Sequence, residues 1–393
     1  MINQTTYEYF GQLLAEAAED VTLAIGSAIT WAVKRVIVDP SRVYRDEDKY
    51  MSRVEQAAGQ WRVDWQAWAQ EDLVNAYLQG IQHTDAELKA LKTKREPQDV
   101  QLIRALGPRQ IRNRPIITEK IEGKFKDYPN HLTMYGVFQA AAYDALERTH
   151  VQIMRESHDL YRDVAVMAGE QRFREGDEFI RREAAQLMLN EFAEKGLQAI
   201  TYRDGRRMSL DAYAEMVGRT MSGQAAVQAS LFRYQEFGYD LVRVSQHFRT
   251  CHMCAPWEGK ILSQSGESER YPHLQDAIDD GLFHPNCAHD ISPYIPGVSP
   301  ELELMAHPEE KRLIEEHGYG KAQEIAYNAQ QQQRYIERKI RRWKRGVVTA
   351  MTEEERAAAE GKVKEWQKRM REHLKEHPYL PRKYKREQPF NAH

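Results

Sequence analysis

The three cysteines of this 393-residue chain, Cys251, Cys254 and Cys287, lie within one short part of the sequence. An odd number of cysteines cannot form a closed set of disulfides, and a secreted disulfide scaffold would carry more of them, spread more widely. The clustering therefore predicts a reducing compartment and a single thiolate site. This prediction constrains the fold, because two separate segments must meet for the three thiols to act together.

The spacing of these cysteines is that of metal ligands. The pattern C-x2-C occurs in CHMCAPWEGK at residues 251–260. The third cysteine, with a histidine on either side, occurs in FHPNCAHD at residues 283–290. Two thiols at C-x2-C spacing can bind one metal ion from a tight turn, as in structural zinc knuckles. The competing interpretation is three unligated thiols beside surface histidines, which the clustering of every cysteine at ligand spacing disfavours.

A structural zinc site needs four protein ligands in tetrahedral geometry. Cys251, Cys254 and Cys287 with one histidine would complete a Cys3His set. We favour His289 as the fourth ligand, because C-x-H brings it in on the same extended turn. His284 is the alternative fourth ligand. The prediction is a zinc ion with a structural role.

Catalytic motifs fit the sequence poorly. The patterns H-E-x-x-H, G-x-G-x-x-G, G-x-x-x-x-G-K-[ST] and G-x-S-x-G do not occur. A zinc deaminase needs H-x-E upstream of P-C-x-x-C, whereas here C-x-x-C comes first. We therefore expect no enzyme. The alternative is a metal-dependent nuclease, with His284 or His289 as the general base and Asn286 orienting it.

Charge is balanced over the whole chain but not along it. The 56 basic and 59 acidic residues give a net charge of −3, so any nucleic-acid contact must be local. QQQRYIERKIRRWKR at residues 331–345 is strongly basic, with Arg334, Arg338, Lys339, Arg341, Arg342, Lys344 and Arg345 against one acid. Three interpretations stay open: a solvated helix face, a surface for DNA phosphates, or a surface for an acidic protein partner.

The sequence predicts an α+β protein that is mainly α-helical, with a small mixed α/β domain that carries the zinc knuckle. Charged residues make up 29% of the chain and hydrophobic residues 41%, which favours long helices with large solvated faces. The apolar run Val21–Val33 is shorter than the roughly 20 residues of a membrane span, so we expect a buried or subunit-facing helix and no membrane span. The N-terminus lacks the pattern of a signal peptide.

We expect four consecutive parts. They are an N-terminal helical arm (1–110), a helical region (111–196), the mixed α/β core with the Cys/His cluster (197–298), and a basic helical region with a tail (299–393). Within the arm, the proline-free stretch 47–93 contains Trp61, Trp65 and Trp68 among interleaved charges and is expected to be a solvated helix.

The mixed part shows local signals for short elements. Leu197–Tyr202 reads as a strand that returns through a tight turn at Asp204-Gly205. Two helices are expected next, Leu210–Val217 and Gln224–Phe237, the second ending at Gly238. Leu241–Gln246 is expected to be a strand that delivers the chain to the first cysteine pair.

Three stretches resemble the phage minor capsid protein 2 family and, more distantly, the head-morphogenesis proteins encoded beside phage portal genes. They are GLQAITYRDGRRMSLDAYAEMVGRT, EFGYDLVRVSQHFRTCHMCAPWEGKILS and GLFHPNCAHDISPYIPG, within about 197–298. The residues that match the family's motif are Cys251, Cys254, Trp257, Gly259, His284, Pro285, Asn286, Cys287 and His289. The sequence departs at Ala288, where the family commonly has a basic residue, so a phosphate grip by this turn is not expected.

The resemblance implies a structural minor capsid protein of a tailed phage. It implies few copies near the portal and the inner capsid face, and a role in head assembly. The implied partners are the portal protein, the major capsid protein and packaged double-stranded DNA. The implied location is the virion, with the host cytoplasm during assembly.

Overall fold

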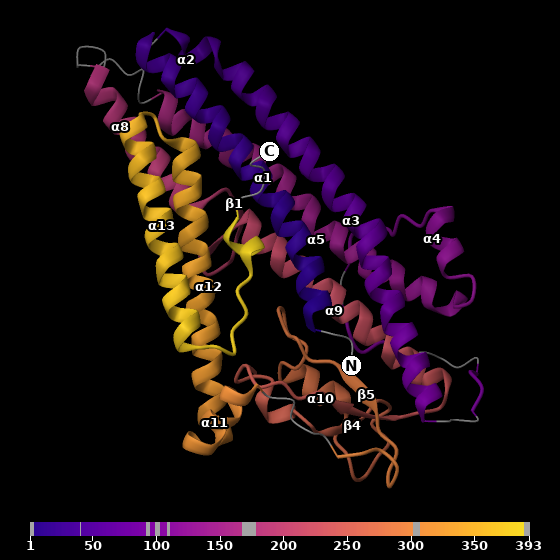
Figure 1. The fold of residues 1–393 in the computed structure, drawn as a ribbon. Coiled ribbons are helices and arrows are strands. Elements are labelled where there is room, and N and C mark those ends of the chain that lie inside the picture. The colour runs from indigo at the N-terminus through magenta and orange to yellow at the C-terminus, as the bar shows by residue number, and fades with distance from the viewer. Residues whose placement is uncertain are drawn as a thin grey trace. The chain divides into compact units, whose positions relative to one another are not determined.

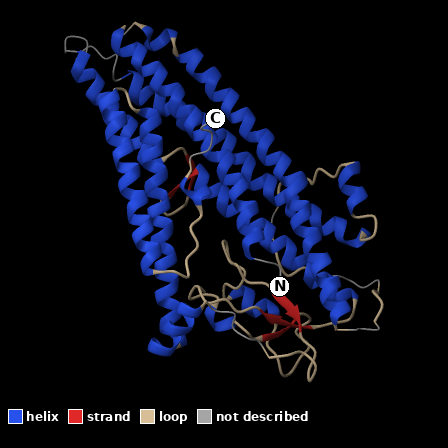
Figure 2. Ribbon diagram, in the orientation of Figure 1, coloured by secondary structure: helices blue, strands red, loops and turns tan. Residues whose placement is uncertain are grey.

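The computed structural model describes residues 4–39, 41–91, 95–98, 103–107, 111–166, 178–301 and 307–388. Within these residues the chain is mainly helical, with a two-stranded and a three-stranded antiparallel sheet (Figures 1 and 2), as the sequence predicts. The α-helices are α1 (Gln4–Val38), α2 (Arg42–Arg45), α3 (Glu47–Ala90), α4 (Glu119–Lys124), α5 (Pro129–Tyr161), α8 (Glu178–Lys195), α9 (Leu210–Glu236), α10 (Leu274–Asp279), α11 (Pro308–His317), α12 (Tyr319–Thr349) and α13 (Glu353–Glu376).

The strands and the shorter helical turns are few and brief. The strands are β1 (Gln198–Thr201), β2 (Arg207–Ser209), β3 (Leu241–Val244), β4 (Ile261–Ser263) and β5 (Ile291–Pro293). A π-helical turn, η1 (Arg162–Val166), follows α5, and 3-10 turns form η2 (Ala255–Trp257) and η3 (Tyr384–Glu387).

The chain forms two compact units, each built from three separate segments. The first unit contains Met1–Leu13, Gln66–Ala145 and Glu215–Asn328, and the second contains Leu14–Trp65, Leu146–Ala214 and Ala329–His393. Helices α1, α3, α5, α9 and α12 each contribute residues to both units. Each unit therefore combines segments that are far apart in the sequence, whereas the predicted parts 1–110, 111–196, 197–298 and 299–393 are each continuous. The division into these four parts stays a prediction.

The long proline-free stretch forms helix α3, but it is not the solvated arm that its charges suggest. The side chains of Trp61, Trp65 and Trp68 are 0%, 1% and 3% exposed. Their spacing of four and three residues places them on one helical face, which forms an apolar stripe. The indole N–H of Trp61 donates to the hydroxyl of Thr149 on α5 at 2.7 Å. Aromatic spacing therefore outweighs the interleaved charges.

Helix α1 contains the apolar run at its centre. The segment Glu8–Val38 is long and apolar enough to cross a membrane by length and composition, and 61% of its most apolar window is buried in the fold. Ile25, Ile29 and Val33 have no exposed surface. Core helices meet the same criterion, and the burial confirms the buried helix predicted for Val21–Val33.

The predicted hairpin is confirmed, and the two helices predicted after it are one. Strands β1 and β2 pair antiparallel around a turn in which Gly205 has a φ of 82°. Helix α9 then runs unbroken through Gly218 and Gly223, where the sequence suggests an interruption. A glycine costs about 1 kcal/mol in a helix, but burial of flanking residues such as Ala226 favours continuity. The helix ends before Gly238, as predicted.

Helices α3 and α9 approach closely in the first unit. A Cβ atom on Gly80 of α3 would lie 2.2 Å from the carbonyl oxygen of Ala226 on α9. The hydroxyl of Ser230 donates to the carbonyl oxygen of Gly80 at 3.1 Å. Only glycine permits this backbone contact, so Gly80 sets the distance between the two helices.

We predict that Gly80→Ala destabilises the protein and that Gly59→Ala, in the same helix, stabilises it. The first change forces α3 away from α9, at a cost of about 1–3 kcal/mol. The second adds a methyl group with no atom within 4 Å. It gains about 0.5–1 kcal/mol, because alanine is the better helix former. Denaturant unfolding measures both, and equal effects would contradict the close contact.

Candidate metal centre

The three-stranded sheet brings the two cysteine segments together. Its order is β4-β3-β5, with both neighbours antiparallel to the central strand β3. Arg243 pairs with Ile261, and Val244 pairs with Ile291. The chain therefore leaves β3, enters β4 and enters β5 at the same end of the sheet. The C-x2-C segment lies between β3 and β4 and the H-P-N-C segment precedes β5, so both meet at this end.

Local backbone hydrogen bonds shape the two ligand turns. The N–H of Ala255 donates to the carbonyl oxygen of Cys251 at 3.0 Å, which closes the first turn. In the second turn, the N–H of Cys287 donates to the carbonyl oxygen of His284 at 2.9 Å. Asn286 has a φ of 70°, a conformation that asparagine adopts more readily than most residues, and its N–H donates to the hydroxyl of Thr220 on α9.

The structure brings all five predicted ligands into one cluster. The Sγ atom of Cys251 lies 3.0 Å from Nε2 of His284, and the Sγ atoms of Cys254 and Cys287 are 3.6 Å apart. Nδ1 of His289 lies 3.3 Å from Sγ of Cys287. Two groups of three donors have all their ligand atoms within 4.8 Å of one another: Cys251, Cys254 and His284, and Cys254, Cys287 and His289. Cys254 belongs to both groups, so it is the centre of the cluster.

The pKa values of the three thiols in this cluster are shifted in different directions. Hydrogen bonding from Cys254 lowers the pKa of Cys251 to about 3, with a further contribution from His284. Cys254 also donates to Cys287 and holds the pKa of that thiol well below its usual range. The pKa of Cys254 itself is raised, because its proton serves both neighbours. A lowered pKa favours the thiolate, which is the form of cysteine that binds metal.

A buried carboxylate, Glu258, lies behind His289. The Glu258 side chain is 4% exposed, yet hydrogen bonds keep its pKa below the usual value although burial raises it. Its donors are the backbone N–H of His247 (2.9 Å), the hydroxyl of Thr250, Nε2 of His289 (3.1 Å), the hydroxyl of Tyr319 (3.3 Å) and the side-chain amide of Gln323 (2.9 Å). Glu258 therefore links the cysteine cluster to the first turns of α12.

The sequence did not predict the residues that surround the ligands, which are Glu258 and its hydrogen-bond partners. Glu258 follows the C-x2-C turn closely, but no spacing rule pairs it with a histidine 31 residues later. The His247 ring lies against His289, with 4.1 Å between the ring centroids and a tilt of 35° between the ring planes. Burial together with the neighbouring His289 lowers the pKa of His247 to about 3. Tyr319 and Gln323 lie on a different helix. Only the folded sheet end shows that these residues share one site.

The two candidate histidines differ in their surroundings. His289 is 3% exposed, with Nδ1 facing a thiolate and Nε2 donating to Glu258. Burial lowers the pKa of His289, but Cys287 and Glu258 outweigh it and raise the value to about 9. His284 is half-buried, and its Nδ1 lies 2.6 Å from the carbonyl oxygen of Pro285. Metal-bound histidines typically donate their other N–H to a carboxylate or carbonyl, so both rings are oriented as ligands.

The basic run forms part of α12, and much of its charge is paired within the second unit. Arg345 is buried, Arg338 is exposed, and the others are half-buried (Arg334, Lys339, Arg341, Arg342 and Lys344). Arg345 pairs with the buried Glu19 at 2.9 Å and donates to the carbonyl oxygen of Ala193. Arg341 pairs with Asp211 at 3.2 Å. These two arginines hold α12 to neighbouring elements of the same unit.

Three of the remaining bases also contact an acid or the tail. Lys339 and Arg342 both pair with Glu194 on α8. The structure describes the tail over residues 381–388. Lys344 donates a hydrogen bond of 2.9 Å to the side chain of Gln388 in this segment. Arg338 lies with its guanidinium 6.0 Å from the ring of Tyr335. The prediction that this helix binds DNA or an acidic partner stays a prediction, and its accessible part centres on Arg338.

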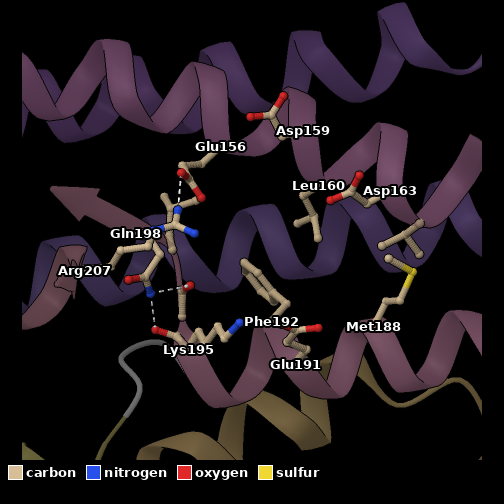
Figure 3. A pocket seen from close by; sticks show the side chains of 13 residues that line it. Glu156, Asp159, Leu160, Asp163, Met188, Glu191, Phe192, Lys195, Gln198 and Arg207 are labelled. Atoms are coloured by element: carbon tan, nitrogen blue, oxygen red, sulfur yellow. Dashed lines mark hydrogen bonds and ion pairs between the residues drawn. The ribbon is translucent and has the colours of Figure 1, made fainter. Parts of the chain in front are cut away.

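A cleft of about 280 Å³ in the second unit is a different kind of site (Figure 3). Its acidic rim consists of Glu156, Asp159, Asp163 and Glu191, and its apolar lining includes Leu160, Val164, Met188 and Phe192. Arg207 and Lys195 also line it, and they pair with Glu156 and Glu191. No lining residue of this cleft is a cysteine or histidine, so it offers no sulfur or imidazole ligand of the kind found in the cluster on the three-stranded sheet.

Comparison with known proteins gives a family for the chain. The sequence model of the family described as Phage minor capsid protein 2 matches residues 45–375. A structural protein of Lactococcus phage LL-H is 24% identical over 215 residues, which cover 51% of this chain and 54% of that protein. The chain thus spans about half the length of that relative.

A shorter relative gives the same description. A structural protein of Lactococcus phage mv4 is 29% identical over 128 residues, which cover 31% of this chain and 94% of that protein. No solved structure matches the chain. The chain belongs to the phage minor capsid protein 2 family, and this membership confirms both the resemblance and the virion location predicted from the sequence.

Proposed function

We propose that this protein is a structural component of a tailed-phage head that acts in assembly near the portal and the inner face of the capsid. Its proposed partners are the portal protein and the major capsid protein, first in the host cytoplasm and then in the virion. The observation that carries the proposal is the family match over residues 45–375, which includes the whole cysteine cluster. The description of both relatives as structural proteins supports it.

Within this role, we propose that the cysteine cluster holds a structural zinc ion. The ligands are Cys251, Cys254, Cys287 and His289, because His289 is the buried histidine whose other nitrogen is fixed by a carboxylate. Sulfur-rich ligand sets favour zinc among the common divalent metals. Such a site contributes on the order of 10 kcal/mol to folding, which suits a sheet of three very short strands.

Zinc binding at this site must displace protons, which sets its pH dependence. Hydrogen bonding to the neighbouring cysteines raises the pKa of Cys254, and Cys287 together with Glu258 raises the pKa of His289 to about 9. Both groups must lose a proton to become ligands. The proposal therefore has zinc affinity rising with pH through the neutral range and falling steeply in acid.

A metal-dependent nuclease is the less favoured function. Nδ1 of His289 faces Cys287 and Nε2 faces Glu258, so this ring is placed as a ligand rather than as a general base. A site closed by four protein ligands leaves no position for an activated water. The family and both relatives are described in structural terms.

Contact with packaged DNA is the finer part of the proposal. A cavity of about 390 Å³ beside α12 is lined by bases that include Lys195, Arg207, Arg338, Lys339 and Arg342. The acids Glu194 and Asp211 also line it and pair with three of its bases. Lys195, Arg207 and Arg345 pair with acids outside the lining, so the excess positive charge is modest. This excess favours a few phosphate contacts rather than a long DNA track.

We expect the protein to be present in purified mature particles and to copurify with the portal protein from infected cells. A head component that acts near the portal stays with it through assembly. Quantitative mass spectrometry of density-purified particles measures its copy number against the portal protein. Detection of the protein only outside assembled heads would reject the proposed role.

For DNA, the double variant Arg338→Ala/Lys339→Ala should bind duplex DNA more weakly than the parent. Its salt dependence should fall by about one unit of slope for each phosphate that the variant no longer neutralises. Lys364→Ala/Arg371→Ala is the matched control, because both residues are exposed bases on α13. Equal binding by all three proteins would exclude DNA contact at α12. Arg341 and Arg345 are left intact, because removing either arginine would leave a buried carboxylate, Asp211 or Glu19, without its ion-pair partner.

For the metal, Glu258→Gln should weaken zinc binding by about 10- to 100-fold, the usual effect of removing an outer-sphere partner. The side-chain amide of the variant is uncharged, so it is a weaker acceptor for the Nε2–H of His289 than the carboxylate of Glu258. Competition with a chelator at fixed pH measures the affinity. Glu269→Gln is the matched control, an exposed carboxylate in the same part of the chain. If Glu258→Gln binds zinc like the parent, or if His284→Ala loses more affinity than His289→Ala, the proposed ligand set is wrong.

A further inference from the structure

A second group of metal-ligating side chains lies at the end of α13, in the second unit. The sequence HLKEH at residues 373–377 places His373, Glu376 and His377 at positions i, i+3 and i+4, which share one helical face. One nitrogen of each imidazole and one carboxylate oxygen lie within 4.8 Å of one another. This group contains no thiol and shares no residue with the cysteine cluster.

The first imidazole is held in place by the neighbouring helix. Nε2 of His373 donates to the carbonyl oxygen of Ala329 on α12 at 2.9 Å, and the residue is 8% exposed. A carbonyl oxygen only accepts, so Nε2 carries the proton and Nδ1 carries the lone pair. Donation of the second ring N–H to a backbone carbonyl is the usual arrangement of a metal-bound histidine.

The second imidazole is oriented from the other side. The rings of His373 and His377 have centroids 4.7 Å apart. Nδ1 of His377 lies 3.1 Å from the hydroxyl of Tyr379, which itself is 6% exposed. When Nδ1 donates to this hydroxyl, the opposite nitrogen, Nε2, carries the lone pair that binds an ion. Both rings are thus positioned by partners other than each other, which lowers the entropic cost of binding an ion between them.

The place of the group in the fold favours a cation. His377 is the C-cap residue of α13, so the group lies at the end of the helix where the backbone carbonyls carry partial negative charge. Glu376 is exposed and adds a full negative charge. Helices α12 and α13 lie side by side (Figure 1). Ile336, Ile340 and Met370 form one buried cluster between them, which supports the end of α13.

We propose that His373, Glu376 and His377 form a second metal site, for a late first-row divalent ion such as Ni²⁺, Cu²⁺ or Zn²⁺. Two imidazoles and one carboxylate are a donor set for such ions, whereas a set of carboxylates and carbonyls would suit Mg²⁺ or Ca²⁺. Three protein ligands leave coordination positions for water or for a donor from another molecule. The bound ion fixes the end of α13 at the point where the chain turns into the tail.

Ni²⁺ is the probe for this site. It is added to full-length protein that has been loaded with one equivalent of zinc and then freed of excess zinc, so that the thiol ligands are occupied and the second site is open. Calorimetry should show one Ni²⁺ bound per chain. His377→Ala should weaken binding by at least the roughly 10-fold that follows removal of even an outer-sphere partner. Ni²⁺ should also raise the melting temperature of the parent and not of the variant. Glu376→Gln, an exposed substitution, should weaken binding in the same direction.

The matched control is His317→Ala. His317 also lies in the last turn of its helix, α11, beside an acid, Glu316, but has no second histidine at i−4. Ni²⁺ binding should be unchanged in this variant. Binding that is equal in the parent, His377→Ala and Glu376→Gln would overturn the proposal, as would the absence of saturable Ni²⁺ binding by the folded parent. Neither outcome bears on the cysteine centre.

Discussion

The pairing of β3 with β4 on one side and β5 on the other is the constraint on which the candidate metal centre depends. These strands have only three or four residues each, yet their antiparallel register places both cysteine segments at one end of the sheet. Once there, Cys254 lies close to both Cys251 and Cys287, and Glu258 contacts His289 behind them. Burying such a charged cluster is costly unless it is fully paired. A bound cation would compensate the thiolate charge that the sheet brings together.

Charge pairing organises the second unit in a similar way. The chain carries nearly equal numbers of acids and bases, and some of them pair inside the fold, as Arg345 does with Glu19 and Arg341 with Asp211. Part of the basic charge of α12 therefore holds this helix against other elements of the same unit. The part of this helix that remains accessible is small and centres on Arg338.

The sequence predicted local features better than distant ones. The β1–β2 hairpin, the buried helix around Ile25 and the meeting of the cysteine segments follow from turn residues, apolar spacing and ligand spacing. Three features did not follow: the continuity of α9 through Gly218 and Gly223, the burial of Trp65, and the contact of Glu258 with His289. Each depends on tertiary packing or on residues far apart in the chain. The division into two units also lies outside sequence reasoning, because long helices contribute to both.

The central claim is that a zinc ion joins the two cysteine segments. X-ray absorption at the zinc edge, on protein purified and dialysed without added metal, tests this claim most directly. We predict about one zinc per chain, with three sulfur ligands near 2.3 Å and one nitrogen ligand at about 2.0 Å. Folded protein without zinc, or zinc surrounded only by oxygen and nitrogen, would contradict it.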